Sequence, residues 1–179
     1  MVTITISGSP GSGKTTVAQL LHEKTEIPYV YSGDLFRSMA QKHRMSLEEF
    51  GRYCESNREV DVELDQQQLR LLKKGDVIVE GRLAGWLAFQ NQISALKVFI
   101  HADLDTRVRR IVNREEGSLQ QRKKEIVTRE KSEAARYKTY YHIDVNDTSI
   151  YDLVIDSSKK TPDEIVVLIV EKLRSTHFL

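Results

Sequence analysis

The residues between positions 8 and 16 have the types and the spacing that bind a polyphosphate. Gly8, Gly13, Lys14 and Thr15 fit the pattern G-x-x-x-x-G-K-[ST]. Glycines allow a tight turn whose backbone N–H groups point at phosphate oxygens, and the following helix adds its dipole. We expect Lys14 to reach the β- and γ-phosphates of a nucleoside triphosphate and Thr15 to bind Mg²⁺. The predicted loop comprises Gly8, Ser9, Pro10, Gly11, Ser12, Gly13, Lys14, Thr15 and Thr16.

Arginines recur at helical spacings in the second half of the chain. Like charges on one helix face repel each other, so a bound polyanion would be a natural partner. Phosphoryl transfer needs such groups, because the protein mainly positions the reactants and offsets the charge on the moving phosphoryl group. Salt-bridged surface helices are the alternative interpretation. The two sets are Arg107, Arg110 and Arg114, spaced i, i+3, i+7, and Arg129, Glu133 and Arg136, spaced i, i+4, i+7.

Two further arginines follow short predicted strands. Arg82 comes two residues after an apolar strand at 76–80, and Arg37 lies on the first turns of a helix that follows the strand 29–31. A guanidinium in either place can bind a phosphate through two parallel hydrogen bonds. We therefore expect both to hold an anionic acceptor, although Arg37 could also be an ordinary surface residue of a capped helix.

Composition and missing motifs exclude several classes of protein. The formal net charge of +1 argues against a nucleic-acid coat or a polybasic membrane binder. The single cysteine, Cys54, allows no internal disulfide and fits a reducing compartment, and the five histidines show no paired metal-ligand spacing. The apolar run at the N-terminus is expected to be a strand rather than a secretion signal. No guanine-reading N-K-x-D follows a strand, so a GTPase is disfavoured.

Strand and helix patterns alternate along the chain, which predicts an α/β fold in one domain, with a five-stranded parallel sheet flanked by helices. Ser46 and Glu49 form a predicted capping box. Trp86 and Phe89 are expected in the core or in the wall of the acceptor pocket. The predicted strands are 2–7, 29–31, 76–80, 96–100 and 152–156, and the predicted helices are 14–26, 34–43, 61–74, 105–116, 118–141 and a last one that begins at 161–162.

The chain resembles the nucleoside monophosphate kinases of the adenylate and cytidylate kinase group, and most closely the short archaeal-type cytidylate kinases. The resemblance covers essentially the whole chain and is carried by residues 8–16, 32–37, 79–82, 110–114 and 129–138. It implies a P-loop kinase fold with a core formed by residues 1–31, 76–114 and 129–179. It also implies an acceptor-binding flap at 32–75 and a lid at 115–128, hinged around Gly117, which close over both substrates.

The resemblance further implies transfer of the γ-phosphoryl group of ATP, with Mg²⁺, to CMP and dCMP. Lys14, Arg37, Arg129 and Arg136 would be catalytic, Arg110 would lie over the adenine, and Arg114 would reach the ATP phosphates. Glu133 corresponds to a carboxylate that contacts the acceptor ribose in bacterial cytidylate kinases. The implied acceptor-binding set is Ser32, Gly33, Arg37, Gly81, Arg82, Arg129, Glu133 and Arg136.

The chain departs from the bacterial pattern where the base is read. Bacterial cytidylate kinases have Asp-Gly-Arg-Asp after the third strand, whereas this chain has Glu80-Gly-Arg-Leu83, and it lacks their large flap insert. Asp61 or Asp65 could instead supply a carboxylate for the cytosine amino group. AMP, UMP, shikimate or dephospho-coenzyme A are alternative acceptors, and a P-loop NTP-binding or RNA-associated ATPase is the alternative from another class. We expect a cytoplasmic monomer without a stable nucleic-acid or membrane partner.

Overall fold

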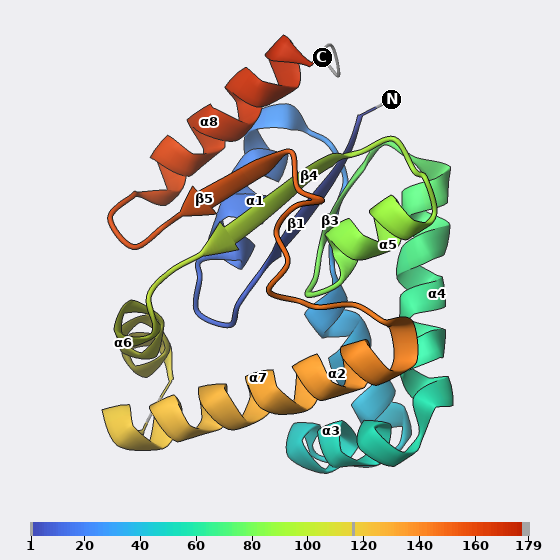
Figure 1. The fold of residues 1–179 in the computed structure, drawn as a ribbon. Helices are drawn as coiled ribbons and strands as arrows, with labels where there is room; N and C mark the ends of the chain where they lie inside the picture. The colour runs from blue at the N-terminus through green and yellow to red at the C-terminus, as the bar shows by residue number, and fades with distance from the viewer. Residues whose placement is uncertain (1, 116, 177–179) are drawn as a thin grey trace.

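The computed structural model describes residues 2–115 and 117–176, and within them five parallel strands form one sheet (Figure 1). The sheet has the order β2-β3-β1-β4-β5, so β1 lies at its centre. Ile6 of β1 is opposite Glu80 of β3, and Gly8 is opposite Ile100 of β4. The predicted parallel sheet is therefore confirmed. The strands are β1 (Thr3–Gly8), β2 (Tyr29–Tyr31), β3 (Val77–Glu80), β4 (Leu96–His101) and β5 (Leu153–Asp156).

Helices cover both faces of the sheet. α1 and α8 pack on one face, and α4 and α5 pack on the other. Figure 1 also shows α7 crossing the molecule beyond the carboxyl ends of the strands, from α6 toward α3. None of the helices in the described part is both long enough and apolar enough to cross a membrane. The helices are α1 (Lys14–Thr25), α2 (Ser32–Lys42), α3 (Leu47–Ser56), α4 (Arg58–Lys74), α5 (Ala84–Gln90), α6 (Leu104–Arg114), α7 (Leu119–Tyr141) and α8 (Pro162–Ser175).

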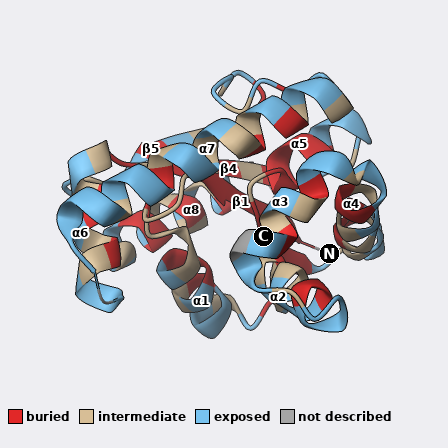
Figure 2. Ribbon diagram, turned by 90° about the horizontal axis from the view of Figure 1, so that it is seen from below, coloured by how far each residue is buried: buried red, intermediate tan, exposed pale blue. Residues whose placement is uncertain are grey.

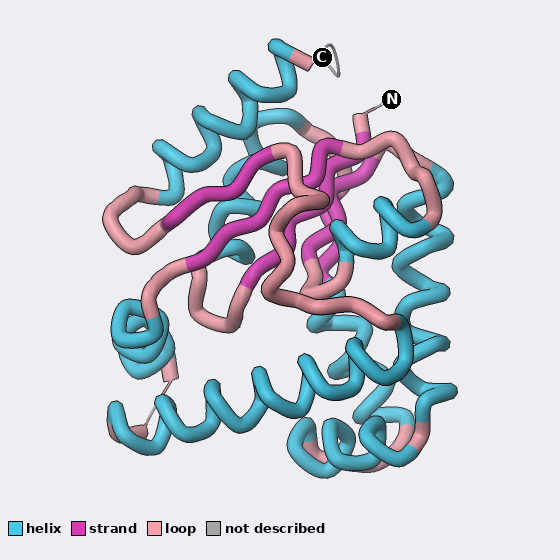
Figure 3. The backbone as a smooth tube through the Cα atoms, viewed as in Figure 1, coloured by secondary structure: helices cyan, strands magenta, loops and turns pink. Residues whose placement is uncertain are grey.

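Buried residues are concentrated in the strands and on the helices next to them (Figure 2). Alternating side chains of the strands fill two separate cores, one on each face of the sheet. Ile4 and Ile6 of β1 point toward α1 and α8, whereas Val77 and Val79 of β3 point toward α5. The long loop between α7 and β5 passes over the α5 side (Figure 3) and contributes Ile143 to that core. β3, which is buried along its whole length, is apolar from Val77 to Val79, as expected of a strand covered on both faces.

The short helix α5 was not predicted. All but its last two residues are buried, so it has no polar face and no amphipathic period to detect. Gly85 lies in its first turn because a Cβ there would come within 2.4 Å of the Tyr151 ring. Elsewhere the bounds differ by a few residues: α4 begins at Arg58 instead of 61, and α6 ends at Arg114. Glu116, the predicted end of that helix, lies outside the described residues. The capping box of Ser46 and Glu49 is present.

Candidate active site

The loop between β1 and α1 presents backbone N–H groups, as its sequence predicts. Gly11 and Gly13 have φ values of +77° and +87°, which residues with side chains rarely adopt. A Cβ on Gly11 would also lie 2.8 Å from the backbone oxygen of Arg107. Gly13 is the N-cap of α1, and the first N–H groups of a helix have no partner within it. The loop and the helix N-terminus together form an anion-binding site.

Glu80, the last residue of β3, joins three polar side chains beneath this loop. Its carboxylate is fully buried. Thr15 Oγ1 donates a hydrogen bond of 2.9 Å to Oε1, and the Tyr29 hydroxyl donates one of 2.5 Å to Oε2. Lys14 Nζ lies 3.8 Å from Oε1. Sequence reasoning did not select Glu80 as a site residue, although an acidic residue at the end of a buried strand was an available signal.

The ammonium group of Lys14 lies in a largely buried position, where its charged form is disfavoured. The pKa of Lys14 is lowered to about 8, chiefly by burial and also by the charges of Arg82 and Arg129, although the Glu80 carboxylate opposes the shift. An arriving polyphosphate would compensate the Lys14 charge.

The residues at the start of α1 suit a small divalent cation. The Thr15 hydroxyl and the Glu80 carboxylate lie within hydrogen-bond distance of each other, and Mg²⁺ prefers hard oxygen ligands of this kind. Mg²⁺ usually takes only one or two protein ligands and completes its shell with phosphate oxygens and water. A ready-made cluster of three or more His, Cys, Asp or Glu side chains does not occur in the described ranges. The donor set fits Mg²⁺ that arrives with a nucleotide.

Two arginines of α6 hold the outer side of the phosphate loop. Arg110 donates to the backbone oxygens of Ser12 at 3.3 Å and Ser157 at 2.7 Å. Arg107 is buried and donates to the backbone oxygen of Pro10 at 3.3 Å and to Glu130 Oε1 at 2.7 Å. The sequence predicted that these arginines share a face, but it did not assign Arg107 to the site. Its spacing of three residues from Arg110 was the signal. Arg114 is exposed and pairs with Glu115.

Arg82 and Arg129 converge on one carboxylate next to the phosphate loop. Arg82 Nε lies 2.5 Å from Glu133 Oε2, and Arg129 Nε donates to Glu133 Oε1 at 2.8 Å. Arg82 Nη1 also donates to the backbone oxygen of Gly8 at 3.0 Å. Burial by itself would raise the pKa of Glu133, but the two guanidinium groups lower that pKa to about 2. The arrangement places two cations beside Lys14 at the carboxyl edge of the sheet.

The predicted acceptor residues of α2 are divided between the interior and the surface. Ser32 Oγ is buried, 2.5 Å from the backbone oxygen of Glu80 and 2.6 Å from Gln68 Oε1. Arg37 is exposed, lies over the Tyr31 ring, and pairs with the exposed Asp34 at 3.0 Å. Gly33 packs against the Tyr31 ring and Gly81 against Ser32, where a Cβ on either glycine would collide. Arg37 is therefore available to a ligand without breaking a buried contact.

Arg136 contacts the predicted flap. Its Nε lies 3.0 Å from Asp61 Oδ2, and its Nη1 donates to the backbone oxygen of Gly51 at 3.3 Å. Both side chains of the ion pair are buried, and burial raises the pKa of Asp61 while the Arg136 charge opposes the shift. The contacts join α7 to α3 and α4. Arg136 therefore pairs with a different carboxylate from Arg82 and Arg129, although all three arginines were predicted to act on phosphate.

Asp65 lies one turn after Asp61 on α4 and has different surroundings. Gln68 Nε2 donates to its Oδ1 at 3.3 Å, and Gln68 in turn contacts Ser32. The pKa of Asp65 is raised to about 7, chiefly by burial, although the charge of Arg136 opposes the shift. A buried polar chain therefore runs from Asp65 through Gln68 and Ser32 to the backbone at the end of β3.

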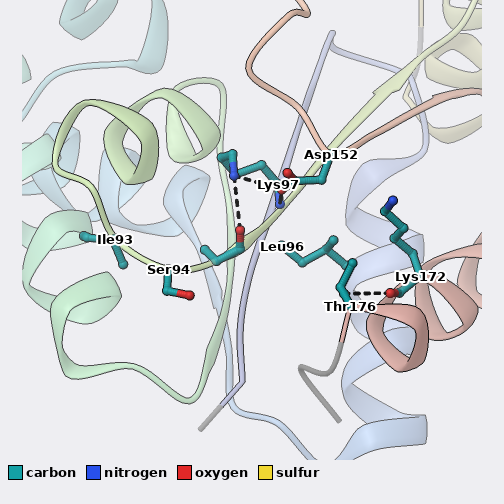
Figure 4. Close-up of a pocket in the computed structure, with 8 residues that line it drawn as sticks. Ile93, Ser94, Leu96, Lys97, Asp152, Lys172 and Thr176 are labelled. Atoms are coloured by element: carbon teal, nitrogen blue, oxygen red, sulfur yellow. Dashed lines mark hydrogen bonds and ion pairs between the residues drawn. The ribbon is translucent and has the colours of Figure 1, made fainter.

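The pocket drawn in Figure 4 is not part of this site. It lies at the amino ends of the strands, next to Leu96 at the start of β4 and Lys172 near the end of α8. Lys97 Nζ and Asp152 Oδ2 form an ion pair of 2.8 Å in its wall. The phosphate loop is at the other edge of the sheet.

Comparison with known proteins places these features in context. A family model described as the cytidylate kinase-like family matches residues 3–159. The cytidylate kinase of Methanococcoides burtonii is 49% identical over 157 residues, which cover 87% of this chain and 87% of the relative. The cytidylate kinase of Methanocaldococcus jannaschii is 45% identical over 157 residues, covering 87% and 88%. A shikimate kinase from Bacteroides thetaiotaomicron superposes with a TM-score of 0.63 at 15% identity, covering 97% and 98%, which shows the fold alone.

Proposed function

Because this chain belongs to the cytidylate kinase-like family, we propose that it phosphorylates CMP, with ATP and Mg²⁺ as the donor and dCMP as a second acceptor. The relatives that carry the name cytidylate kinase cover most of the chain, so the activity applies to the whole of it. One observation carries the proposal: Arg82 donates to the backbone oxygen of Gly8, the first residue of the phosphate loop. An acceptor phosphate bound by Arg82 would then lie next to the donor's terminal phosphate.

On the donor side, the loop N–H groups and Lys14 would bind the β- and γ-phosphates of ATP. Arg110 would lie beside the adenine and Arg114 beside the phosphates, with Arg107 fixing the loop. Thr15 and Glu80 would hold Mg²⁺, which supplies charge neutralisation on the transferred group when it is bound. The Thr15 and Glu80 contact supports this assignment of the metal ligands.

On the acceptor side, Arg37 and Arg82 would hold the CMP phosphate and Arg129 would offset charge on the group in transfer. The acceptor phosphate is already an anionic nucleophile, so no general base is required. The ion pair with Asp61 supports a different role for Arg136, which is to hold the flap, residues 32–75, against α7. Closure of that flap and of the lid, residues 115–128, would exclude water from the transferred group.

Base recognition is assigned to Asp65 rather than to Asp61. Asp61 is already paired with Arg136, whereas the hydrogen bond described for Asp65 comes from the neutral side chain of Gln68. A carboxyl oxygen of Asp65 would accept a hydrogen bond from the amino group of cytosine. In uracil a carbonyl oxygen, which has no hydrogen to donate, stands at that position. Asp65→Leu should therefore reduce the preference for CMP over UMP.

We also propose that the protein is a cytoplasmic monomer. The test is an ADP-coupled assay with CMP, dCMP, UMP, AMP, shikimate and dephospho-coenzyme A at saturating ATP and Mg²⁺. We expect the highest kcat/KM with CMP. A kcat/KM at least about tenfold higher with AMP or shikimate, which is a difference of about 1.4 kcal/mol in transition-state stabilisation, would overturn the assignment of the acceptor.

A further inference from the structure

Glu133 contacts Arg82 and Arg129, the two arginines beside it on the proposed acceptor side, through the Nε atom of each. Its Oε2 lies 2.5 Å from Arg82 Nε, and its Oε1 accepts from Arg129 Nε at 2.8 Å. The Glu133 side chain is 7% exposed, whereas that of Arg129 is 64% exposed. The carboxylate therefore lies on the buried side of the two guanidinium groups, whereas most of the Arg129 side chain is exposed to solvent.

Contact through Nε leaves the terminal nitrogens of an arginine free for a second anion. Arg82 Nη1 donates to the backbone oxygen of Gly8. Within residues 2–115 and 117–176, three terminal nitrogens have no hydrogen-bond partner. They are Nη2 of Arg82 and both terminal nitrogens of Arg129. Guanidinium carries five donors in a planar fork, so one carboxylate on the Nε edge and one phosphate on the other edge can bind together.

The charge on Glu133 also keeps the two arginines close to each other. Two cations near Lys14 repel one another, and a buried carboxylate between them offsets that repulsion. The same two guanidinium groups keep the carboxylate ionised, since they lower its pKa to about 2. A neutral side chain of equal size would remove the ion pairs that hold the Nε edges of both arginines, and Arg82 would keep only its hydrogen bond to Gly8.

We infer that Glu133 is a positioning residue for phosphoryl transfer: its carboxylate fixes Arg82 and Arg129 by their Nε edges and aims their terminal nitrogens at the acceptor phosphate. The inference rests on the proposed function. It differs from the role that the resemblance to bacterial cytidylate kinases implies, in which the corresponding carboxylate contacts the acceptor ribose. The two roles separate experimentally, because the first acts on the phosphate and the second on the nucleoside.

The test compares CMP with cytidine, which lacks only the phosphate. Dissociation constants of both ligands are measured for the wild-type protein and for Glu133→Gln, with cytidine read as a competitive inhibitor against CMP. We expect Glu133→Gln to bind CMP about tenfold more weakly and to lose about 100-fold in kcat, as a misaligned catalytic group does. The affinity for cytidine should change by less than about twofold, the accuracy with which independent effects usually add.

Two further variants control the result. Glu133→Asp keeps the charge but shortens the side chain, so it should retain more kcat than Glu133→Gln. Glu171→Gln makes the same change of charge on the exposed surface of α8 and should leave both affinities unchanged. If Glu133→Gln does not fold, the same comparison of CMP with cytidine is made with Glu133→Asp.

Parallel weakening of CMP and cytidine would overturn the inference in favour of a ribose contact. Unchanged CMP affinity and kcat in Glu133→Gln would also overturn it, because the ion pairs would then be dispensable. Failure of the proposed function is distinguishable, because in that case the wild-type protein would form no ADP with CMP.

Discussion

The Thr15 hydroxyl donates a hydrogen bond of 2.9 Å to Oε1 of Glu80 and so joins the first turn of α1 to the end of β3. The strand register makes this contact possible, because Glu80 lies opposite Ile6 near the end of the neighbouring β1. Parallel strands bring their carboxyl ends to one edge of the sheet, where the phosphate loop also begins. Two side-chain oxygens thereby meet next to the phosphate loop.

Glu80→Gln tests the metal site. Removing the negative charge weakens a Mg²⁺ ligand, so we expect kcat to fall by about 100-fold, the size of effect of one lost electrostatic group at a reacting centre. The concentration of free Mg²⁺ that gives half-maximal activity should rise. Tyr29→Phe removes the hydrogen bond to the other oxygen of Glu80 but keeps its charge, and should change this Mg²⁺ requirement much less. An unaltered Mg²⁺ dependence in Glu80→Gln would contradict the assignment.

Lys14 should make donor use depend on pH. Its pKa is lowered to about 8, mainly by burial, so the charged form is complete only below that pH. Because the charged form is needed to bind phosphate, kcat/KM for ATP should fall as the pH rises through about 8. This ratio reports the protonation states of the free enzyme. In Lys14→Arg the descending limb should move to higher pH, and Lys14→Ala should lose transfer at every pH while keeping its circular dichroism spectrum. A flat profile from pH 7 to 10 would refute this role.

Arg37→Ala should affect the acceptor and spare the donor. Arg37 is exposed and pairs only with exposed Asp34 among its described ion pairs, so stability should change by less than about 0.5 kcal/mol. We expect KM for CMP to rise about tenfold and KM for ATP to stay within about twofold. Lys42→Ala removes an exposed cation from the end of the same helix and is the matched control. Should KM for ATP alone respond, Arg37 belongs to the donor side.

Asp65 should make the free energy of unfolding depend on pH. The pKa of Asp65 is raised to about 7 from its ordinary value of 3.8, chiefly by burial and also by the charge of Asp61, although the charge of Arg136 opposes the rise. Between these values the folded protein holds a proton that the unfolded chain has lost, so the stability contributed by the neutral form is lost as the pH rises through about 7. The difference between wild type and Asp65→Asn should grow from pH 5 to 7 by at most about 1.4 kcal/mol per pH unit. Urea titrations at several pH values measure it, and a constant difference would exclude the effect.

Much of the fold followed from local patterns. Alternating strands and helices predicted the parallel sheet, and the glycine pattern between β1 and α1 predicted the phosphate loop, because both depend on residues close together in the chain. The family and the phosphorylation of CMP were also predicted and are confirmed by the relatives. Helix α5 escaped prediction because burial on all sides removes the amphipathic period that identifies a helix.

Residue types and helical spacing established which groups are present and which face of a helix each occupies. Their partners depend on how the elements pack: Glu80 with Thr15, Glu133 between Arg82 and Arg129, and Asp61 with Arg136. Arg82 and Glu133 are 51 residues apart and Thr15 and Glu80 are 65 apart, so no spacing rule relates them. The reason is physical, since periodicity follows from the backbone geometry of one element, whereas an ion pair depends on how the sheet register and the packing of α7 bring separate elements together.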